Sequence, residues 1–378
     1  MPRRPHCLLV MLCVLAELLC QTGGASARPP EARIAALRRG INITGWFRHP
    51  VSADPAALRS YLGDGAIADL RQAGFTFVRL AVDPALLEAP AIRDVLVGAV
   101  RRLNRVGLAV VISIHPNAWY LETSPADRDR LHAAWQRLAP ALRRLDPARV
   151  IPELLNEPVF PGDPAGWHRL QQALLAQLRA DLPASTIVLT GHDWSSIAGL
   201  QALMPEADSD VVYGFHFYDP PELTSLAAYR AGLDRAALAR LPFPADDPPA
   251  CDAVARPVSD PATRDLMRYY CALHWDHARI RARIDAAADW ARRHNVVLLA
   301  GEFGASIDLN AAARLAWLRT VRDRFEANGI GWALWGYDDR MGLGIQRPPG
   351  NAPLLPAETL QALGLSGGAA LGRRHGFP

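Results

Sequence analysis

Short apolar runs of strand length recur along this chain, separated by longer segments whose apolar residues have helical spacing. The run Leu108–Ile114 is apolar apart from Ser113, as in strands that are buried on both faces of a parallel sheet. In the segment before it, Ile92, Val95 and Ala99 fall on one face of a helix. Strands that alternate with helices in this way predict a parallel sheet.

Eight runs of this kind occur. From the end of one run to the end of the next, the chain is usually about long enough for one helix and one strand. They cover residues 40–46, 75–81, 108–115, 149–157, 185–192, 211–218, 295–302 and 330–335. Eight such units fit a closed ring of strands better than an open sheet with helices on both faces. We therefore expect the α/β class and a single (β/α)8 TIM barrel.

One interval, residues 219–273, is longer than the others by about one further unit. It follows the sixth run, is rich in proline and contains Cys251 and Cys271. A segment of this length without structure of its own is usually functional, so we expect a long loop that walls the barrel mouth. A decoration of the surface is the alternative. The two cysteines indicate one disulfide in an exported chain, with two separate buried thiols as the alternative.

The N-terminus joins two arginines to an apolar run, Cys7–Cys20, and then to a small-residue site that ends at Ala27. This pattern is typical of a secretory signal peptide, so we expect residues 1–27 to be cleaved and the mature protein to be secreted or periplasmic. Glu17 inside the apolar run leaves an uncleaved anchor as the alternative, although the run is short for a bilayer span. No other segment is apolar enough to cross a membrane.

Composition changes this interpretation little. Of the 378 residues, 50% are hydrophobic and 21% charged, which supports a folded domain, here residues 28–365, with a disordered tail at residues 366–378. The formal net charge is only +3 and the arginines form no basic run, so we expect no nucleic-acid partner. We expect a monomer that binds a neutral or weakly charged ligand.

Two glutamates end strands that face each other across such a barrel: Glu157 the fourth and Glu302 the seventh. Loops at the carboxyl ends of barrel strands build the active site. Glycoside hydrolysis needs one acid to protonate the leaving oxygen and one carboxylate for the anomeric carbon. Arg79 and Tyr218 could keep Glu302 ionised, whereas Glu157 needs a raised pKa to carry a proton. Asn156 could donate to a sugar hydroxyl.

Six motifs in this order resemble those of the clan A glycoside hydrolases, most closely glycoside hydrolase family 5, the cellulase family. The resemblance covers nearly the whole mature chain. The motifs are Phe77-Val78-Arg79-Leu80, Ile114-His115, Leu155-Asn156-Glu157-Pro158, His216-Phe217-Tyr218, Gly301-Glu302-Phe303-Gly304 and Trp332-Ala333-Leu334-Trp335.

The resemblance implies a retaining double displacement without a metal or other cofactor. Glu157 would be the acid/base and Glu302 the nucleophile, with Trp335 as the floor on which the sugar stacks. The residues around that sugar would be Arg79, His115, Asn156, His216 and Tyr218. Two features depart from the commoner pattern and leave the substrate open: the long sixth loop, and Ser113, where many relatives carry an acidic residue.

Three further aromatic residues, Trp46, Trp119 and Trp194, lie at or just past strand ends, where they would stack on sugar rings. The alternative for each is a place in the core. His192 also ends a strand, and we interpret it as a structural residue.

The expected ligand is a β-linked polysaccharide or oligosaccharide, and the first hypothesis is an endo-β-1,4-glucanase. Another β-glycan, such as mannan, β-1,3-glucan or an exopolysaccharide, is the alternative. A metal-dependent amidohydrolase is disfavoured because its usual His-x-His pair on the first strand is here Asn42-Ile43-Thr44. Both glutamates and Arg79 argue against a non-catalytic glycan-binding barrel.

Overall fold

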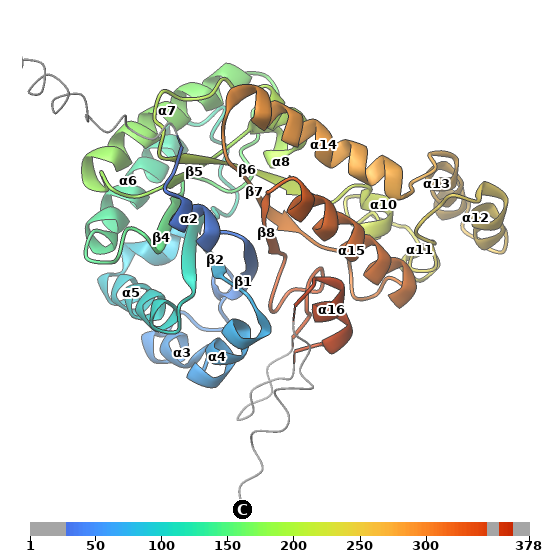
Figure 1. Ribbon diagram of the computed structural model, residues 1–378, viewed down its shortest axis with the longest axis horizontal. Coiled ribbons are helices and arrows are strands. Elements are labelled where there is room, and N and C mark those ends of the chain that lie inside the picture. Colours follow the sequence, from blue (N-terminus) through green and yellow to red (C-terminus); the bar gives the residue numbers. More distant parts are fainter. Residues whose placement is uncertain (1–27, 346–354, 366–378) are drawn as a thin grey trace, which may run out of the picture.

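The computed structural model describes residues 28–345 and 355–365 (Figure 1). The expected signal peptide, residues 1–27, and the expected disordered tail, residues 366–378, lie outside these ranges and stay predictions. Within the described ranges, no helix combines the length and the apolar character needed to span a bilayer.

Eight parallel strands form a closed barrel in which neighbours follow chain order, and β8 pairs with β1. The predicted α/β barrel is therefore confirmed. The strands are β1 (Arg39–Phe47), β2 (Phe77–Val82), β3 (Ala109–Ile114), β4 (Val150–Glu153), β5 (Ile187–Thr190), β6 (Val211–Phe217), β7 (Leu298–Phe303) and β8 (Gly331–Leu334).

Helices surround the barrel (Figure 1). Their apolar faces, as in α5, pack on the outward side chains of the strands. Helix α4 ends at Gly74, whose φ of 109° is in the left-handed region that glycine tolerates. Those that precede the sixth strand are α2 (Glu31–Ala36), α3 (Pro55–Ser60), α4 (Asp64–Ala73), the 3-10 helix η1 (Pro84–Glu88), α5 (Pro90–Arg105), α6 (Pro125–Leu142), α7 (Pro164–Asp181), α8 (His192–Ser195) and α9 (Ile197–Gln201). Those that follow it are α10 (Pro221–Thr224), α11 (Arg235–Leu238), α12 (Pro248–Ala255), α13 (Pro261–Ala272), α14 (His277–His294), α15 (Ala311–Ala327) and α16 (Ala357–Ala362).

On β2 and β4, side chains that point into the barrel change from apolar to polar along the strand. On β2, Phe77 belongs to the apolar cluster inside the barrel, and Arg79, two residues further, is also fully buried. On β4, Ile151 is followed in the same way by Glu153. Alternate residues of a strand share a face, so this pattern places a polar layer directly above an apolar one. That polar layer forms the floor of the barrel mouth.

The insertion after β6 is not the irregular loop that its prolines suggested, since it contains α10, α11, α12 and α13. Its first part stays at the mouth: the Thr224 hydroxyl donates to the Tyr218 carbonyl at 2.6 Å, and the Ser306 amide donates to the Thr224 carbonyl at 2.7 Å. Helices α12 and α13 instead lie outside the ring of helices, beyond the ends of α14 and α15 (Figure 1). The start of the insertion therefore borders the mouth, and α12 and α13 do not.

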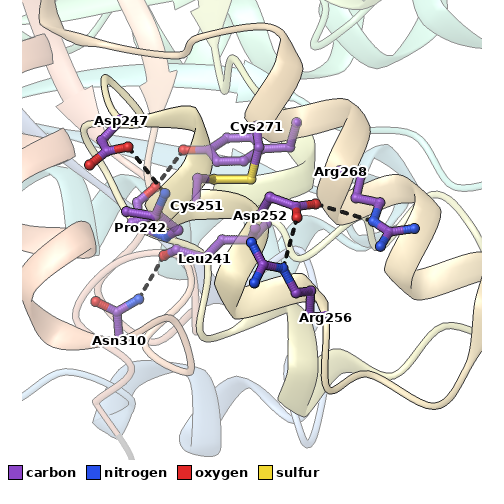
Figure 2. Close-up of a disulfide and its surroundings, with 11 residues drawn as sticks. Leu241, Pro242, Asp247, Cys251, Asp252, Arg256, Arg268, Cys271 and Asn310 are labelled. Carbon is purple, nitrogen blue, oxygen red and sulfur yellow. Dashed lines mark hydrogen bonds and ion pairs between the residues drawn. A yellow bond between two sulfur atoms is a disulfide. The ribbon is translucent and has the colours of Figure 1, made fainter.

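We call α12, α13 and the turn between them the disulfide lobe. The predicted disulfide joins Cys251 in α12 to Cys271 in α13 (Figure 2). Beside it, Asp252 pairs with Arg256 at 3.3 Å and with Arg268 at 3.1 Å. The Tyr270 hydroxyl, near the lobe's base, donates to the carbonyl of Pro242 at 2.7 Å.

Candidate active site

Arg79 lies at the centre of the polar layer, with every donor of its guanidinium engaged. Nε and Nη2 each donate to one oxygen of Glu153 at 2.6 Å, and Nη1 donates to Glu302 at 2.7 Å. Further bonds go to neutral acceptors: Asn42 at 2.8 Å, Ser113 at 3.1 Å and Asn156 at 2.9 Å. The two carboxylates raise the pKa of Arg79 in spite of its burial, so it is permanently charged.

Glu302 is near the end of β7 and is 4% exposed. One of its oxygens accepts from Arg79, and the other accepts from the Tyr218 hydroxyl at 2.9 Å. Burial raises the pKa of Glu302, while the positive charges of His216 and Arg79 act against that rise. Its two oxygens are thus fixed by donors that favour the anion.

Glu157 does not end a strand, because β4 stops at Glu153 and Glu157 follows in the next turn at φ 45°. Its Oε1 lies 2.9 Å from Nδ1 of His216, and the same Nδ1 lies 3.5 Å from Oε2 of Glu302. One oxygen of each glutamate and the ring nitrogen all lie within 4.8 Å of one another. The two carboxyl groups therefore meet at the mouth, although they are 145 residues apart (302 − 157).

Two titratable neighbours of the glutamates, His216 and Tyr218, have raised pKa values, and a third, His115, has a lowered one. Burial disfavours a charged His216 ring, but the charge of Glu302 and the hydrogen bond to Glu157 raise its pKa overall. Burial and the charge of Glu302 raise the pKa of Tyr218 well above its usual value, so its hydroxyl stays a donor. Burial, together with the charges of Arg79 and Arg48, holds the pKa of His115 far below its usual value. His115 is therefore neutral.

Glu157, His216 and Glu302 also offer three atoms at a spacing that a metal ion could use. However, one carboxylate of this set is already hydrogen-bonded to the Arg79 guanidinium. A fixed positive charge in contact with a ligand oxygen disfavours a cation there. The arrangement therefore suits proton transfer better than metal binding.

The four tryptophans that we expected to contact sugar lie in different surroundings. Trp335 is half-buried, with its ring stacked on His115 at 5.9 Å and with the Arg48 guanidinium 5.6 Å away. Trp194 is 59% exposed, and its amide donates to the Pro158 carbonyl, directly after Glu157, at 3.2 Å. Trp119 is half-buried beside a depression of about 480 Å³ that η1 and α6 also line. Trp335 and Trp194 are thus available to a ligand near the glutamates, and Trp119 faces a groove along the outer wall.

Trp46 is fully buried, and its indole N–H donates to the Leu58 carbonyl at 2.8 Å. The register between β1 and β2 shifts between Ile43 and Phe47, and Trp46, which lies within this stretch, stacks against Tyr61 in the core. No face of the ring is open to a sugar, so the prediction that Trp46 binds substrate is wrong. His192, which we interpreted as structural, is half-buried at the start of α8.

Sequence reasoning missed Glu153 and Asn42 as parts of the site. Asn42 accepts from Arg79 and donates to the carbonyls of Gly301 and Leu334, so it links β1 to β2, β7 and β8. A usable signal was present, because Glu153 stands two residues after the inward-facing Ile151 in a run that is otherwise apolar. A carboxylate in that position must point into the barrel and needs a buried cation.

A (β/α)8 barrel with two glutamates at its mouth is the arrangement of a glycoside hydrolase. The model of the family "Cellulase (glycosyl hydrolase family 5)" matches residues 44–340. The chain belongs to this family and is a glycoside hydrolase.

Several known proteins are similar to it. Endoglucanase 3 of Fibrobacter succinogenes is 25% identical over 338 residues, which are 81% of this chain and 50% of that protein. This chain thus spans half the length of that relative. Endoglucanase C of Acetivibrio thermocellus is 22% identical over 325 residues, 80% of this chain and 92% of that one. The structure of endoglucanase Cel5A from Thermotoga maritima shares the fold, with a TM-score of 0.71 and 20% identity over 89% of this chain and 99% of that one.

Proposed function

We propose that this protein is an exported endo-β-1,4-glucanase that hydrolyses its substrate with retention of configuration. The observation that carries the proposal is the close approach of Glu157 and Glu302. One carboxylate oxygen of each lies within 4.8 Å of the other. Retaining enzymes hold their two carboxyl groups about 5–5.5 Å apart, whereas inverting enzymes leave room for a water molecule between them at about 6.5–9.5 Å.

In the first step Glu302 attacks the anomeric carbon while Glu157 donates a proton to the departing oxygen. Glu302 suits this role because Arg79 and Tyr218 hold both of its oxygens in place. Glu157 is the more exposed of the two and contacts His216, which can hold or exchange the proton. In the second step Glu157 takes a proton from water, and that water releases the sugar from Glu302.

The neighbouring residues can orient the sugar at the cleavage point. Asn156 accepts from Arg79 through Oδ1, and this turns its amide group to serve as a donor to a sugar hydroxyl. Trp335 offers an aromatic face beside His115, and Trp194 offers another on the side of the Glu157 loop. Aromatic faces of this kind stack on the apolar faces of pyranose rings.

The names of the relatives favour β-1,4-glucan, because those with the stronger similarity are endoglucanases and another is a cellodextrinase. Mannan is the second candidate, since one structure of Thermotoga maritima Cel5A is described in complex with a mannotriose substrate. The disulfide supports export to an oxidising compartment, in line with the expected signal peptide.

A polysaccharide panel tests this proposal. The protein without residues 1–27 is incubated with cellulose derivatives, mannan and β-1,3-glucan, and the configuration of the first product is followed by NMR, with Glu302→Ala as the blank. We expect fastest release of oligosaccharides from β-1,4-glucan and a β anomer that appears first. An initial α anomer would contradict retention, and faster hydrolysis of mannan would favour the second candidate.

Treatment with a chelator distinguishes the proposed mechanism from metal-assisted hydrolysis. Because protons and carboxylates carry the proposed steps, we expect full activity after dialysis against EDTA. Loss of activity that returns with added divalent metal would contradict this mechanism and would assign a metal to Glu157, His216 and Glu302.

A further inference from the structure

Glu153 is a fully buried carboxylate in the polar layer of the barrel. Both of its oxygens accept from Arg79 at 2.6 Å, through Nε and Nη2. Glu302 is bound to the same guanidinium by a single bond from Nη1 at 2.7 Å. One permanent cation therefore serves two carboxylates, and Glu153 takes the larger share of its hydrogen bonds.

Two negative charges on one cation oppose each other. Arg79 favours the ionised form of Glu302, while Glu153, bound to the other side of the same guanidinium, disfavours it. The effect is strong here because the side chains of Arg79 and Glu153 are 0% exposed, and that of Glu302 is 5% exposed. Charges are screened little where water is excluded.

We infer that Glu153 is a positioning residue that sets the ionisation of Glu302 through their shared guanidinium, and so fixes the lower pH limit of catalysis. This inference rests on the proposed role of Glu302 as nucleophile. Glu153 acts through Arg79 and does not contact the sugar.

The other groups that face this cluster do not replace Glu153. Glu302 also meets His216 and Tyr218 at the end of β6, and feels Glu157 from the turn after β4. The remaining acceptors of Arg79, from β1, β3 and the turn after β4, are the neutral side chains of Asn42, Ser113 and Asn156. Among the residues that the structure describes, removing the charge of Glu153 therefore leaves Glu302 as the one anion hydrogen-bonded to Arg79.

The sign of the effect follows directly. Glu153→Gln removes a neighbouring negative charge, so the pKa of Glu302 falls and the acidic limb of the rate profile moves to lower pH. The shift should be measurable because the two carboxylates share one guanidinium in a site from which water is excluded. A merely structural role for Glu153 would instead lower activity at every pH without moving the limb.

Ser113 allows the opposite change. It pairs with Glu153 in the register of β3 and β4, and its hydroxyl accepts from Nη2 of Arg79 at 3.1 Å. Ser113→Asp therefore adds a second competing carboxylate, which raises the pKa of Glu302 and moves the acidic limb to higher pH. Glu153→Gln combined with Ser113→Asp keeps the number of charges and should return the limb toward that of the unchanged protein.

The test is kcat/KM of the protein without residues 1–27 on an aryl β-cellobioside between pH 3 and 8, because this ratio reports ionisations of the free enzyme. Glu222→Gln is the matched control: Glu222, in α10, is 8% exposed and accepts its hydrogen bond from the Tyr229 hydroxyl at 2.9 Å and not from Arg79. We expect an unmoved limb for this control, a downward shift of about one pH unit for Glu153→Gln and an upward shift for Ser113→Asp.

Limbs that stay in place, or that move in the same direction in both variants, would overturn the inference. If Glu153→Gln does not fold, Ser113→Asp decides alone, and an unmoved or lowered limb overturns it. Glu302→Ala with added azide tests the underlying role separately. Rescue by azide together with unmoved limbs rejects only the inference, whereas absence of rescue rejects the nucleophile assignment as well.

Discussion

The barrel mouth and the disulfide lobe both pair arginines with acids, but in opposite surroundings. In the mouth, Arg79 and Glu153 are 0% exposed. In the lobe, the side chains of Asp252 and Arg268 are 36% and 48% exposed. A buried charge without its partner is very costly, while an exposed pair contributes little. The charges of the mouth are thus fixed by one another, whereas the lobe depends on its disulfide.

The largest effect is expected in the mouth, from Glu302→Gln. Without a nucleophile the first step cannot occur, so turnover should fall on the order of 10⁴-fold or more. Oligosaccharide binding, measured by calorimetry, should persist because the size and shape of the side chain are kept. Turnover close to that of the unchanged protein would remove the nucleophile assignment.

Glu157→Ala should have an effect that depends on the leaving group. Substrates with poor leaving groups need the proton and should slow by roughly 10²–10⁴-fold, while aryl glycosides with activated leaving groups should slow much less in the first step. Rates on a cello-oligosaccharide and on a dinitrophenyl cellobioside measure the difference. Equal slowing of both substrates would show that Glu157 is not the proton donor.

Arg79→Ala compares the two regions directly in stability. It leaves Glu153 and Glu302 buried without their cation, so the free energy of unfolding should fall by about 3–5 kcal/mol. Its counterpart in the lobe, Arg268→Ala, breaks an exposed pair and should cost less than about 1 kcal/mol. Urea unfolding of both variants gives the two values. Similar losses of unfolding free energy in the two variants would contradict the expected difference between the mouth and the lobe.

The smallest effect on catalysis is expected from Cys251→Ser with Cys271→Ser. The disulfide closes a separation of 20 residues, so its loss should destabilise the lobe by about 3 kcal/mol. Because α12 and α13 lie outside the ring of helices, kcat on short substrates should stay within about twofold, a change of under about 0.5 kcal/mol. Proteolysis between Cys251 and Cys271 should become faster. A large loss of kcat would place the lobe at the site.

The strands and the pairing of the glutamates could be predicted because both follow from local pattern. Largely apolar runs such as Leu108–Ile114 become buried parallel strands, and strand order in a barrel fixes which ends meet. The position of Glu157 was less accessible. Its turn conformation, at φ 45°, depends on contacts across the mouth and not on its neighbours in sequence.

The lobe was misinterpreted because its prolines were taken as signs of irregular chain. Pro248 and Pro261 in fact occupy the first turns of α12 and α13, where a missing N–H costs nothing. The preceding Asp247 and Asp260 cap these helices by accepting from Ala250 and Thr263. An aspartate followed by proline was therefore a helix signal that the sequence contained.

The sequence could not decide between the core and the site for Trp46, since Trp46 lies in the stretch over which the register between β1 and β2 shifts. Alternation along β1 gives no indication of that shift. Glu153, by contrast, could have been found from its place after Ile151 on the inward face, once the run was treated as a barrel strand.

The most direct test of the central claim, that Glu302 and Glu157 act as nucleophile and acid/base, is to trap the covalent intermediate. A 2-deoxy-2-fluoro-β-cellobioside with an activated leaving group is added, and the labelled peptide is identified by mass spectrometry. We expect one fluorocellobiosyl group per chain, esterified to Glu302. A label on Glu157, or hydrolysis of the reagent without any label, would contradict it.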